Sequence, residues 1–164
     1  PPAGTLELAV VALPQAPVRG VHATPLRREA ALAFLPAAWK APRRLSPQWL
    51  AERPLIMNDA STRLYRLTAE WFSAAGVHCR PRIELNYNDA IRTLVAAGYG
   101  AALLPEEAHE PARDPRIAVR PLSPALWRQL GLAVSDRGTS GPTRFVLEAL
   151  LPGRNGGGGG GSAP

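Results

Sequence analysis

Apolar and polar positions follow a clear pattern in residues 88–105, where the chain reads NDAIRTLVAAGYGAALLP. Apolar or small residues recur three or four positions apart, as on one face of an α-helix, at Ile91, Leu94, Val95 and Gly98. Gly98 stands where the end of a helix needs a left-handed residue. Residues 101–104 form a continuous apolar run, and Pro105 cannot extend a strand ladder. The pattern predicts a helix followed by a buried, parallel strand.

The same reading predicts the other elements. Strands or short extended pieces are expected at residues 6–13, 18–25, 29–35, 55–57, 80–85, 117–122 and 126–135. Helical spacing of apolar positions occurs at residues 47–52, 61–75 and 143–151. Ser46 and Pro47 provide an N-cap and a first helical residue, and Gly76 closes the second helix. A loop is expected at 36–44, a short acidic turn or helix at 106–110, and a turn at 138–142.

The order of these elements indicates the fold class. Strands that alternate with helices of about ten to fifteen residues favour an α/β fold with a parallel sheet. Extended pieces dominate before residue 45, and regular alternation begins after residue 54, which favours parts of two lobes. Residues 153–164, GRNGGGGGGSAP, are expected to be a flexible tail without a core.

Charge and composition narrow the function classes. The 46% hydrophobic content suffices for a core, and no run approaches the roughly 20 apolar residues of a membrane span. The net charge of +6 comes from scattered arginines and the single lysine, Lys40, without a run of five. This disfavours direct DNA binding by this segment, because a nucleic-acid surface needs clustered charge. A mild attraction for anionic ligands remains.

The cysteine count and the first residues carry less information. Cys79 is the only cysteine, so an internal disulfide framework is excluded. The opening residues, PPAGTLEL, lack an initiator Met, a basic segment and an apolar signal stretch. We therefore expect that the sequence starts at a cut within a longer chain.

No motif for covalent or metal chemistry stands out. Gly98 and Gly100 follow a helix and precede a strand, which is the reverse of the dinucleotide-binding order. Neither a G-x-S-x-G elbow nor a P-loop is present. The histidines are isolated, and His78-Cys79 is only a pair, so we expect no catalytic residue, no metal site and no cofactor.

Residues 58–63, Asn-Asp-Ala-Ser-Thr-Arg, lie between a predicted strand end and a predicted helix start. Ligands of open α/β sheets collect at the carboxyl ends of strands. A helix N-terminus adds unpaired backbone N–H groups and partial positive charge. Ser61 and Thr62 add hydroxyl groups, and Arg63 adds a cation, which suits a small carboxylate or another anionic metabolite.

An ordinary helix cap is the alternative interpretation of this segment, with Asp59 or Ser61 as the N-cap residue. Asn88-Asp89, before the next helix, repeats both the geometry and the ambiguity.

Several short motifs keep a common order from about Thr5 to Leu151. The clearest are LELAV at 6–10, PL with Glu29 and LP at 25–36, PLI at 54–56, and I..LVAAGYGAALLP at 91–105. Weaker matches are Arg63, Phe72, Gly76, Pro121-Leu122 and Leu130-Gly131-Leu132. This series resembles the effector-binding domain of LysR-type transcriptional regulators, whose corresponding helix-to-strand run reads "I..LVAAGLGIALLP". Glu7 stands where the family usually has Asp.

The resemblance implies an α/β, periplasmic-binding-protein-like (type 2) fold with two lobes and an incomplete first lobe. It implies a remnant of lobe I at 1–40, lobe II at 41–122, a return to lobe I at 123–151, and the tail at 152–164. The crossings between lobes are expected near 35–44 or slightly earlier, and near 121–131. The family's N-terminal winged helix-turn-helix and linker helix are not in this sequence.

The resemblance also implies a function. We expect a bacterial, cytoplasmic sensor domain, not an enzyme, that binds a small anionic effector between its lobes. DNA would be bound only through the missing helix-turn-helix, a homodimer or tetramer would form through the helix at 61–75, and no membrane would be involved. The expected effector-binding residues are Asn58, Ala60, Ser61, Thr62, Arg63 and Asn88 in lobe II, with Val11 and Leu13 in lobe I.

Three other interpretations stay open from the sequence. A solute-binding protein of a transport system has the same fold and would need a signal peptide upstream. A small α/β enzyme lobe would need a catalytic pair, and none is evident. The chain could also be a fragment that lacks independent function, since part of one lobe is missing.

Overall fold

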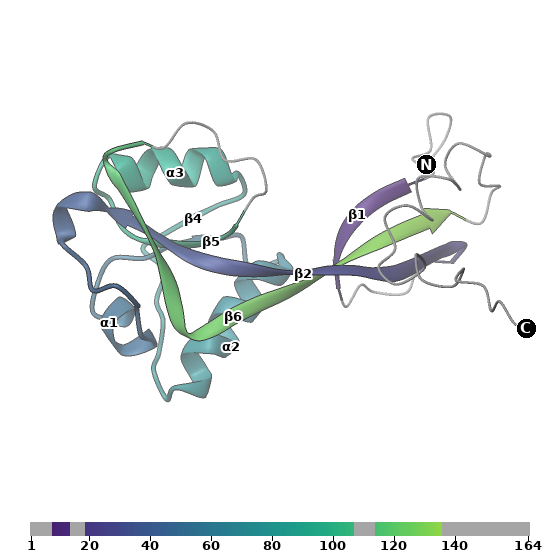
Figure 1. The fold of residues 1–164 in the computed structure, drawn as a ribbon, viewed down its shortest axis with the longest axis horizontal. Helices are drawn as coiled ribbons and strands as arrows, with labels where there is room; N and C mark the ends of the chain where they lie inside the picture. Colours follow the sequence, from purple (N-terminus) through teal and green to yellow (C-terminus); the bar gives the residue numbers. More distant parts are fainter. Residues whose placement is uncertain (1–7, 14–18, 107–113, 136–164) are drawn as a thin grey trace, which may run out of the picture. The chain divides into compact units, whose positions relative to one another are not determined.

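The computed structural model describes residues 8–13, 19–106 and 114–135 (Figure 1). The start of the first predicted strand, most of the 106–110 segment, the 138–142 turn, the 143–151 helix and the tail lie outside these residues. The chain divides into two compact units, which we call unit 1 (residues 1–28 and 129–164) and unit 2 (residues 29–128). The boundary at 128 falls inside the crossing expected near 121–131, whereas the boundary at 28 precedes the expected start of lobe II at 41. The four-part division proposed from the sequence stays a prediction.

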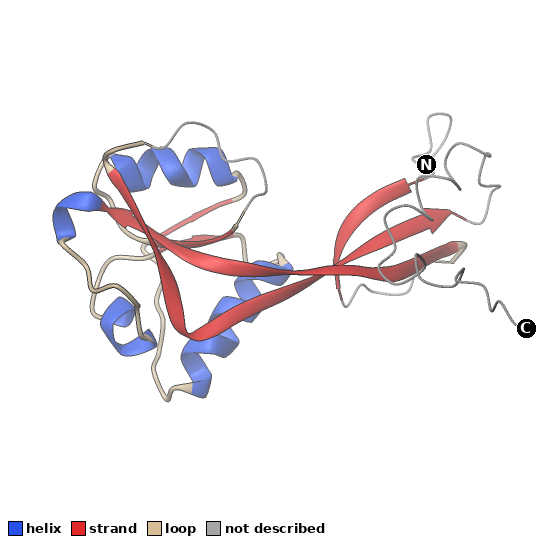
Figure 2. Ribbon diagram, viewed as in Figure 1, coloured by secondary structure: helices blue, strands red, loops and turns tan. Residues whose placement is uncertain are grey.

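Helices and strands alternate through the middle of the chain (Figure 2). In chain order the elements are β1 (Leu8–Leu13), β2 (Val21–Pro36), η1 (Ala37–Trp39), α1 (Pro47–Ala51), β3 (Ile56–Asn58), α2 (Arg63–Ala74), β4 (Ile83–Leu85), α3 (Asn88–Ala96), β5 (Ala102–Pro105) and β6 (Ile117–Ser135). The predicted cap of α1 is confirmed, because the Ser46 hydroxyl accepts a hydrogen bond from the Trp49 amide at 3.2 Å. The predicted loop at 36–44 contains the short 3-10 helix η1.

Two pairs of predicted strands are continuous strands in the structure. The pieces expected at 18–25 and 29–35 merge into β2, and those at 117–122 and 126–135 merge into β6. Both strands contain prolines, and the fixed φ of proline is compatible with extended backbone. Pro25, Pro121 and Pro124 are solvent-exposed, and the extended conformation continues past each of them.

The prediction of a parallel sheet is only partly correct. The four-stranded sheet has the order β1-β6-β2-β5, and the pairs β1–β6 and β2–β5 are antiparallel. Parallel pairing joins β3 to β4, and isolated parallel bridges join Leu55 to Ala101 and Leu45 to Leu122. The helix–strand spacing indicates a parallel return, but it does not specify that β5 also pairs with the much earlier strand β2.

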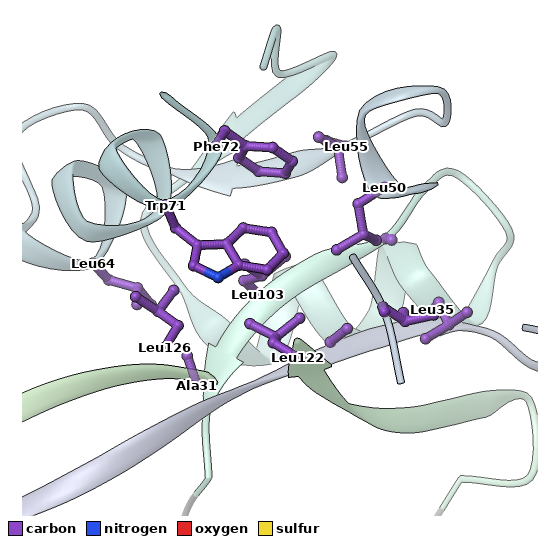
Figure 3. Close-up of a cluster of buried hydrophobic side chains, with 13 residues drawn as sticks. Ala31, Leu35, Leu50, Leu55, Leu64, Trp71, Phe72, Leu103, Leu122 and Leu126 are labelled. Atoms are coloured by element: carbon purple, nitrogen blue, oxygen red, sulfur yellow. The ribbon is translucent and has the colours of Figure 1, made fainter. Parts of the chain in front are cut away.

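Alternation along β2 and β5 gives unit 2 two apolar layers. Ala31, Ala33, Leu35 and Leu103 face one cluster with α1 and α2, where Trp71 and Phe72 pack edge to face at 5.0 Å (Figure 3). Strand residues of the opposite register, Phe34, Ala102 and Leu104, cluster with Ile91 and Val95 of α3. This period of two in the strands, combined with amphipathic helices on both sides, builds a helix–sheet–helix arrangement in unit 2.

The turn that follows α3 contains the left-handed glycine that the sequence predicts. Gly98 has a φ of 89°, so it is the left-handed residue after the helix. Position 100 needs glycine for another reason, because a Cβ atom built there would lie 2.8 Å from the carbonyl oxygen of Pro54. The close approach allows the Ala101 amide to donate to that same oxygen at 3.0 Å.

Unit 1 contains β1, which pairs with the second half of β6. Val11 lies opposite Gly131 and Leu13 opposite Gln129. A Cβ atom at Gly131 would come within 2.6 Å of a Leu13 methyl group, so the glycine makes room for that side chain.

Candidate functional site

The candidate site of unit 2 lies where a strand ends and two helices begin. Asn58 is the last residue of β3 and pairs in parallel with Leu85, the last residue of β4. Helix α2 follows β3, and helix α3 starts at Asn88 shortly after β4. The Asn58 side-chain amide donates to Asn88 Oδ1 at 3.1 Å. Two of the predicted effector-binding residues, 30 positions apart in sequence, are therefore in direct contact.

Asn58 is buried, with 7% of its surface exposed. A buried amide is costly unless it is hydrogen-bonded. The bond to Asn88 uses one Asn58 donor and one Asn88 acceptor, which leaves Asn58 Oδ1 and the Asn88 amide N–H groups for a further partner.

The loop between β3 and α2 is organised by its own side chains. The Asp59 carboxylate accepts a hydrogen bond from the Ser61 backbone amide at 2.8 Å. Hydrogen bonds from the backbone and the side chain of Ser61 lower the pKa of Asp59. The Thr62 hydroxyl donates to the Asp59 carbonyl at 2.8 Å and accepts from the Tyr65 amide at 3.2 Å. Thr62 is therefore the N-cap of α2, and the alternative that Asp59 or Ser61 caps the helix is wrong. Thr62 is closer to the helix than either candidate, and only its hydroxyl reaches the third residue along.

The predicted effector-binding residues of this loop differ in solvent exposure and in unused hydrogen-bonding groups. Ala60 and Ser61 are exposed, whereas Thr62 and Arg63 are half-buried. The Thr62 hydroxyl already has both a donor and an acceptor role within the loop. Arg63 Nε is buried and has no hydrogen-bond partner among the described residues. A guanidinium with an unpaired N–H at a helix N-terminus is suited to an anion.

A small pocket beside Asn58 adds residues that the sequence reading missed. Its empty volume is about 240 Å³ including open solvent, and its walls are Leu55, Ile56, Met57, Asn58, Tyr65, Thr68, Phe72 and Leu103. Thr68 is only 4% exposed. It lies on the apolar face of α2 between Leu64 and Trp71, so a polar residue at an otherwise apolar position was the available signal.

Val11 and Leu13, the two residues predicted from lobe I, lie on β1 in unit 1. Both are half-buried, and the Leu13 side chain packs over Gly131. Their role in effector binding stays a prediction.

Cys79 has the features of an unreactive thiol. Burial raises its pKa to about 11, and the thiol donates to the Met57 sulfur at 3.4 Å. Reactive cysteines need a lowered pKa. Within the described ranges no group of His, Cys, Asp or Glu has a metal-binding arrangement. No helix of these ranges is long and apolar enough to span a membrane.

The fold and site define an α/β ligand-binding domain of two units joined by long strands. Comparison with known families makes this specific, because the LysR substrate binding domain model matches residues 3–152. The chain therefore belongs to the LysR substrate-binding domain family. This finding confirms the resemblance drawn from the 88–105 run and its flanking motifs.

One curated relative is a probable nitrogen assimilation transcriptional activator from Synechococcus elongatus. It is 34% identical over 95 residues, which cover 57% of this chain and 31% of the relative. The chain thus spans about a third of that protein's length, and the aligned part does not include a complete regulator.

Solved structures of regulators share the fold. Full-length OxyR from Pseudomonas aeruginosa matches with a TM-score of 0.69 and 24% identity over 88% of this chain and 48% of OxyR. The regulatory domain of CcmR from Synechocystis, in complex with 2-PG, matches with a TM-score of 0.70 and 19% identity, over 88% of this chain and 72% of that domain. CbnR, a LysR family transcriptional regulator, matches with a TM-score of 0.76 and 14% identity, over 90% of this chain and 52% of CbnR. These likenesses confirm the periplasmic-binding-protein-like fold class.

Proposed function

We propose that this chain is the effector-sensing domain of a bacterial LysR-type transcriptional regulator, and that Asn58, Ser61, Arg63 and Asn88 bind the effector. The observation that carries the site is the Asn58–Asn88 contact, which brings the starts of α2 and α3 to the end of β3. Family membership supports the sensor role over the transport alternative.

The proposed effector is a small anionic metabolite. Arg63 supplies a cation with an unpaired Nε, and the start of α2 supplies partial positive charge. The net charge of +6 favours the approach of anions over a longer range. Val11 and Leu13 of unit 1 would contact the same effector from the other lobe. The structurally similar CcmR regulatory domain was solved with a bound small molecule, 2-PG.

The proposed mechanism is noncovalent. The effector shifts a population between open and closed states to the extent that it binds one state more tightly. DNA binding belongs to a part of the regulator outside this chain, and the whole protein would act in the cytoplasm as a dimer or tetramer. Residues 61–75 are the proposed dimer contact. The domain would thus sense a ligand without catalysing a reaction.

The site assignment is tested by Ser61→Ala combined with Arg63→Ala. We expect the effector concentration for half-maximal response to rise about tenfold or more, because a hydrogen bond to a charged group contributes roughly 1.5–3 kcal/mol. The effector is first found by a thermal-shift screen of small carboxylates and phosphorylated acids. A reporter assay of the full-length regulator then measures the response.

The matched control changes the same residue types at exposed positions of unit 2 outside both the proposed effector site and the proposed dimer contact, as Arg80→Ala with Ser123→Ala. This control should leave the dose-response unchanged. An unaltered response in the Ser61/Arg63 variant, with its thermal stability preserved, would refute the assignment of these two residues.

A further inference from the structure

The ion pair between Glu29 and Arg128 joins two strands that are distant in sequence. Arg128 Nε donates to Glu29 Oε2 at 2.9 Å, and Arg128 Nη2 lies 2.8 Å from the same oxygen. The side chains are 9% and 23% exposed for Glu29 and Arg128, respectively. Two short contacts to one carboxylate oxygen fix the position of the guanidinium relative to the strand that carries Glu29.

The position of this pair is unusual. Glu29 is the first residue of unit 2, on β2, and Arg128 is its last residue, on β6. These two strands are the described connections between the units. On the unit 1 side of the same boundary, the side-chain amide of Gln129 donates to the Arg27 backbone carbonyl at 2.8 Å. The ion pair therefore ties both connections together where they leave unit 2.

Stability alone does not explain a charged pair at this place. The flanking residues Leu126 and Leu130 are buried, so apolar side chains are compatible with this part of β6. Replacing a buried ion pair with apolar residues is often neutral or stabilising, because the desolvation of both charges opposes their attraction. What an ion pair adds is a fixed geometry, since a buried charge strongly disfavours any arrangement in which its partner is lost.

We propose that Glu29 and Arg128 form a clamp that sets the end of unit 2 and limits bending of the two connecting strands. Bending is then confined to the unit 1 side of the boundary. Resting on the proposed function, the clamp would set the balance between open and closed states, and so the sensitivity of the effector response. Glu29 and Arg128 act in this proposal as positioning residues and do not touch the effector.

The test measures the spread of distances between the two units in the 164-residue chain without any effector. Spin labels are placed at Val10→Cys in unit 1 and Tyr87→Cys in unit 2, two exposed positions, in a Cys79→Ser background. Pulsed electron resonance then gives the distance distribution. Because no effector is used, failure of the proposed binding site does not affect the result.

Four further variants are compared in this background. We expect Glu29→Gln and Arg128→Gln to broaden the distribution, and the charge swap Glu29→Arg with Arg128→Glu to restore its width. The matched control is Asp114→Asn, which removes the exposed ion pair Asp114–Arg116. It should leave the width unchanged. An unchanged width in both single variants, or failure of the swap to restore it, would overturn the proposal.

Amide hydrogen exchange separates a clamp from a general support of the fold. We expect Glu29→Gln to accelerate exchange about tenfold in β2 and β6 next to the boundary and to leave α3 and β5 unchanged. Equal acceleration throughout unit 2 would instead show that the pair supports the whole unit, and would also overturn the clamp.

Discussion

At the scale of single residues, Cys79 gives a direct test of how burial controls chemistry. Its pKa of about 11 predicts slow alkylation at pH 8, with a rate that rises about tenfold per pH unit until the thiolate predominates. Because the folded-state pKa is raised, this group stabilises the fold fully below its unfolded pKa, and that contribution is lost as pH rises through the folded value. Iodoacetamide labelling followed by mass spectrometry measures the rate.

Unfolding in urea is the control for this labelling, since the released thiol should react at the rate of a model peptide. Rapid labelling of the folded chain at pH 8 would contradict the burial of Cys79 and reopen a redox role.

Single residues also show the limits of sequence reasoning at the site. The polar run at 58–63 and its helix start could be recognised from residue types, because hydroxyl, amide and guanidinium groups follow an apolar strand. The residue that caps the helix could not be predicted, because Asp59, Ser61 and Thr62 are all good N-cap residues. The structure shows that Asp59 folds back on Ser61 and leaves the cap to Thr62.

At the scale of elements, the turn between α3 and β5 separates two uses of glycine. Gly100→Ala should destabilise unit 2 by about 1–3 kcal/mol, because the new methyl group meets the Pro54 carbonyl and overpacking costs this much. Gly98→Ala has open space, and should cost only about 1–2 kcal/mol for its left-handed backbone. Urea unfolding monitored by tryptophan fluorescence measures both.

A second comparison tells the two mechanisms apart. Asparagine tolerates the left-handed conformation, so Gly98→Asn should recover part of the loss seen with alanine. Gly100→Asn should be worse than Gly100→Ala. The same rank order at both positions would contradict this explanation.

Elements with local signals are the ones that the sequence predicts well. The helix α3, its glycine and the strand β5 follow from spacing within about 18 residues, and α1 follows from Ser46 and Pro47. Strand pairing does not follow from local spacing, because β5 pairs with β2, some 70 residues earlier, and no local pattern encodes that partner. The full lengths of β2 and β6 were missed for a related reason, because each strand pairs with strands distant in sequence.

At the scale of the whole molecule, the fold and family were recognisable because several weak motifs keep one order over most of the chain. No single motif specifies a two-lobed sensor. The order of strands and helices does, since each element supplies the surface on which the next one packs. The chemical identity of the effector is encoded differently, by a few side chains whose arrangement depends on contacts such as Asn58–Asn88.

The described cores predict unequal stability in the two units. In unit 2, both faces of β2 and β5 are covered, with Leu35, Ile91 and Val95 fully buried. In unit 1, β1 is only half-buried, and Val10 is 60% exposed. Amides of α3 and β5 should therefore exchange at least about a hundredfold more slowly than those of β1, since exchange rates follow local opening free energies.

Hydrogen exchange of the 164-residue chain, resolved by peptide and mass spectrometry, measures this difference directly. Ile91→Ala provides the internal check, because a cavity in the α3 layer should accelerate exchange in α3 and β5 and leave β1 unchanged. Uniform protection of both units would contradict the prediction and show that they open together. Rapid exchange everywhere would instead support the view that the chain is a fragment without a stable fold of its own. Strong protection confined to unit 2 would identify residues 29–128 as the stable part of the chain.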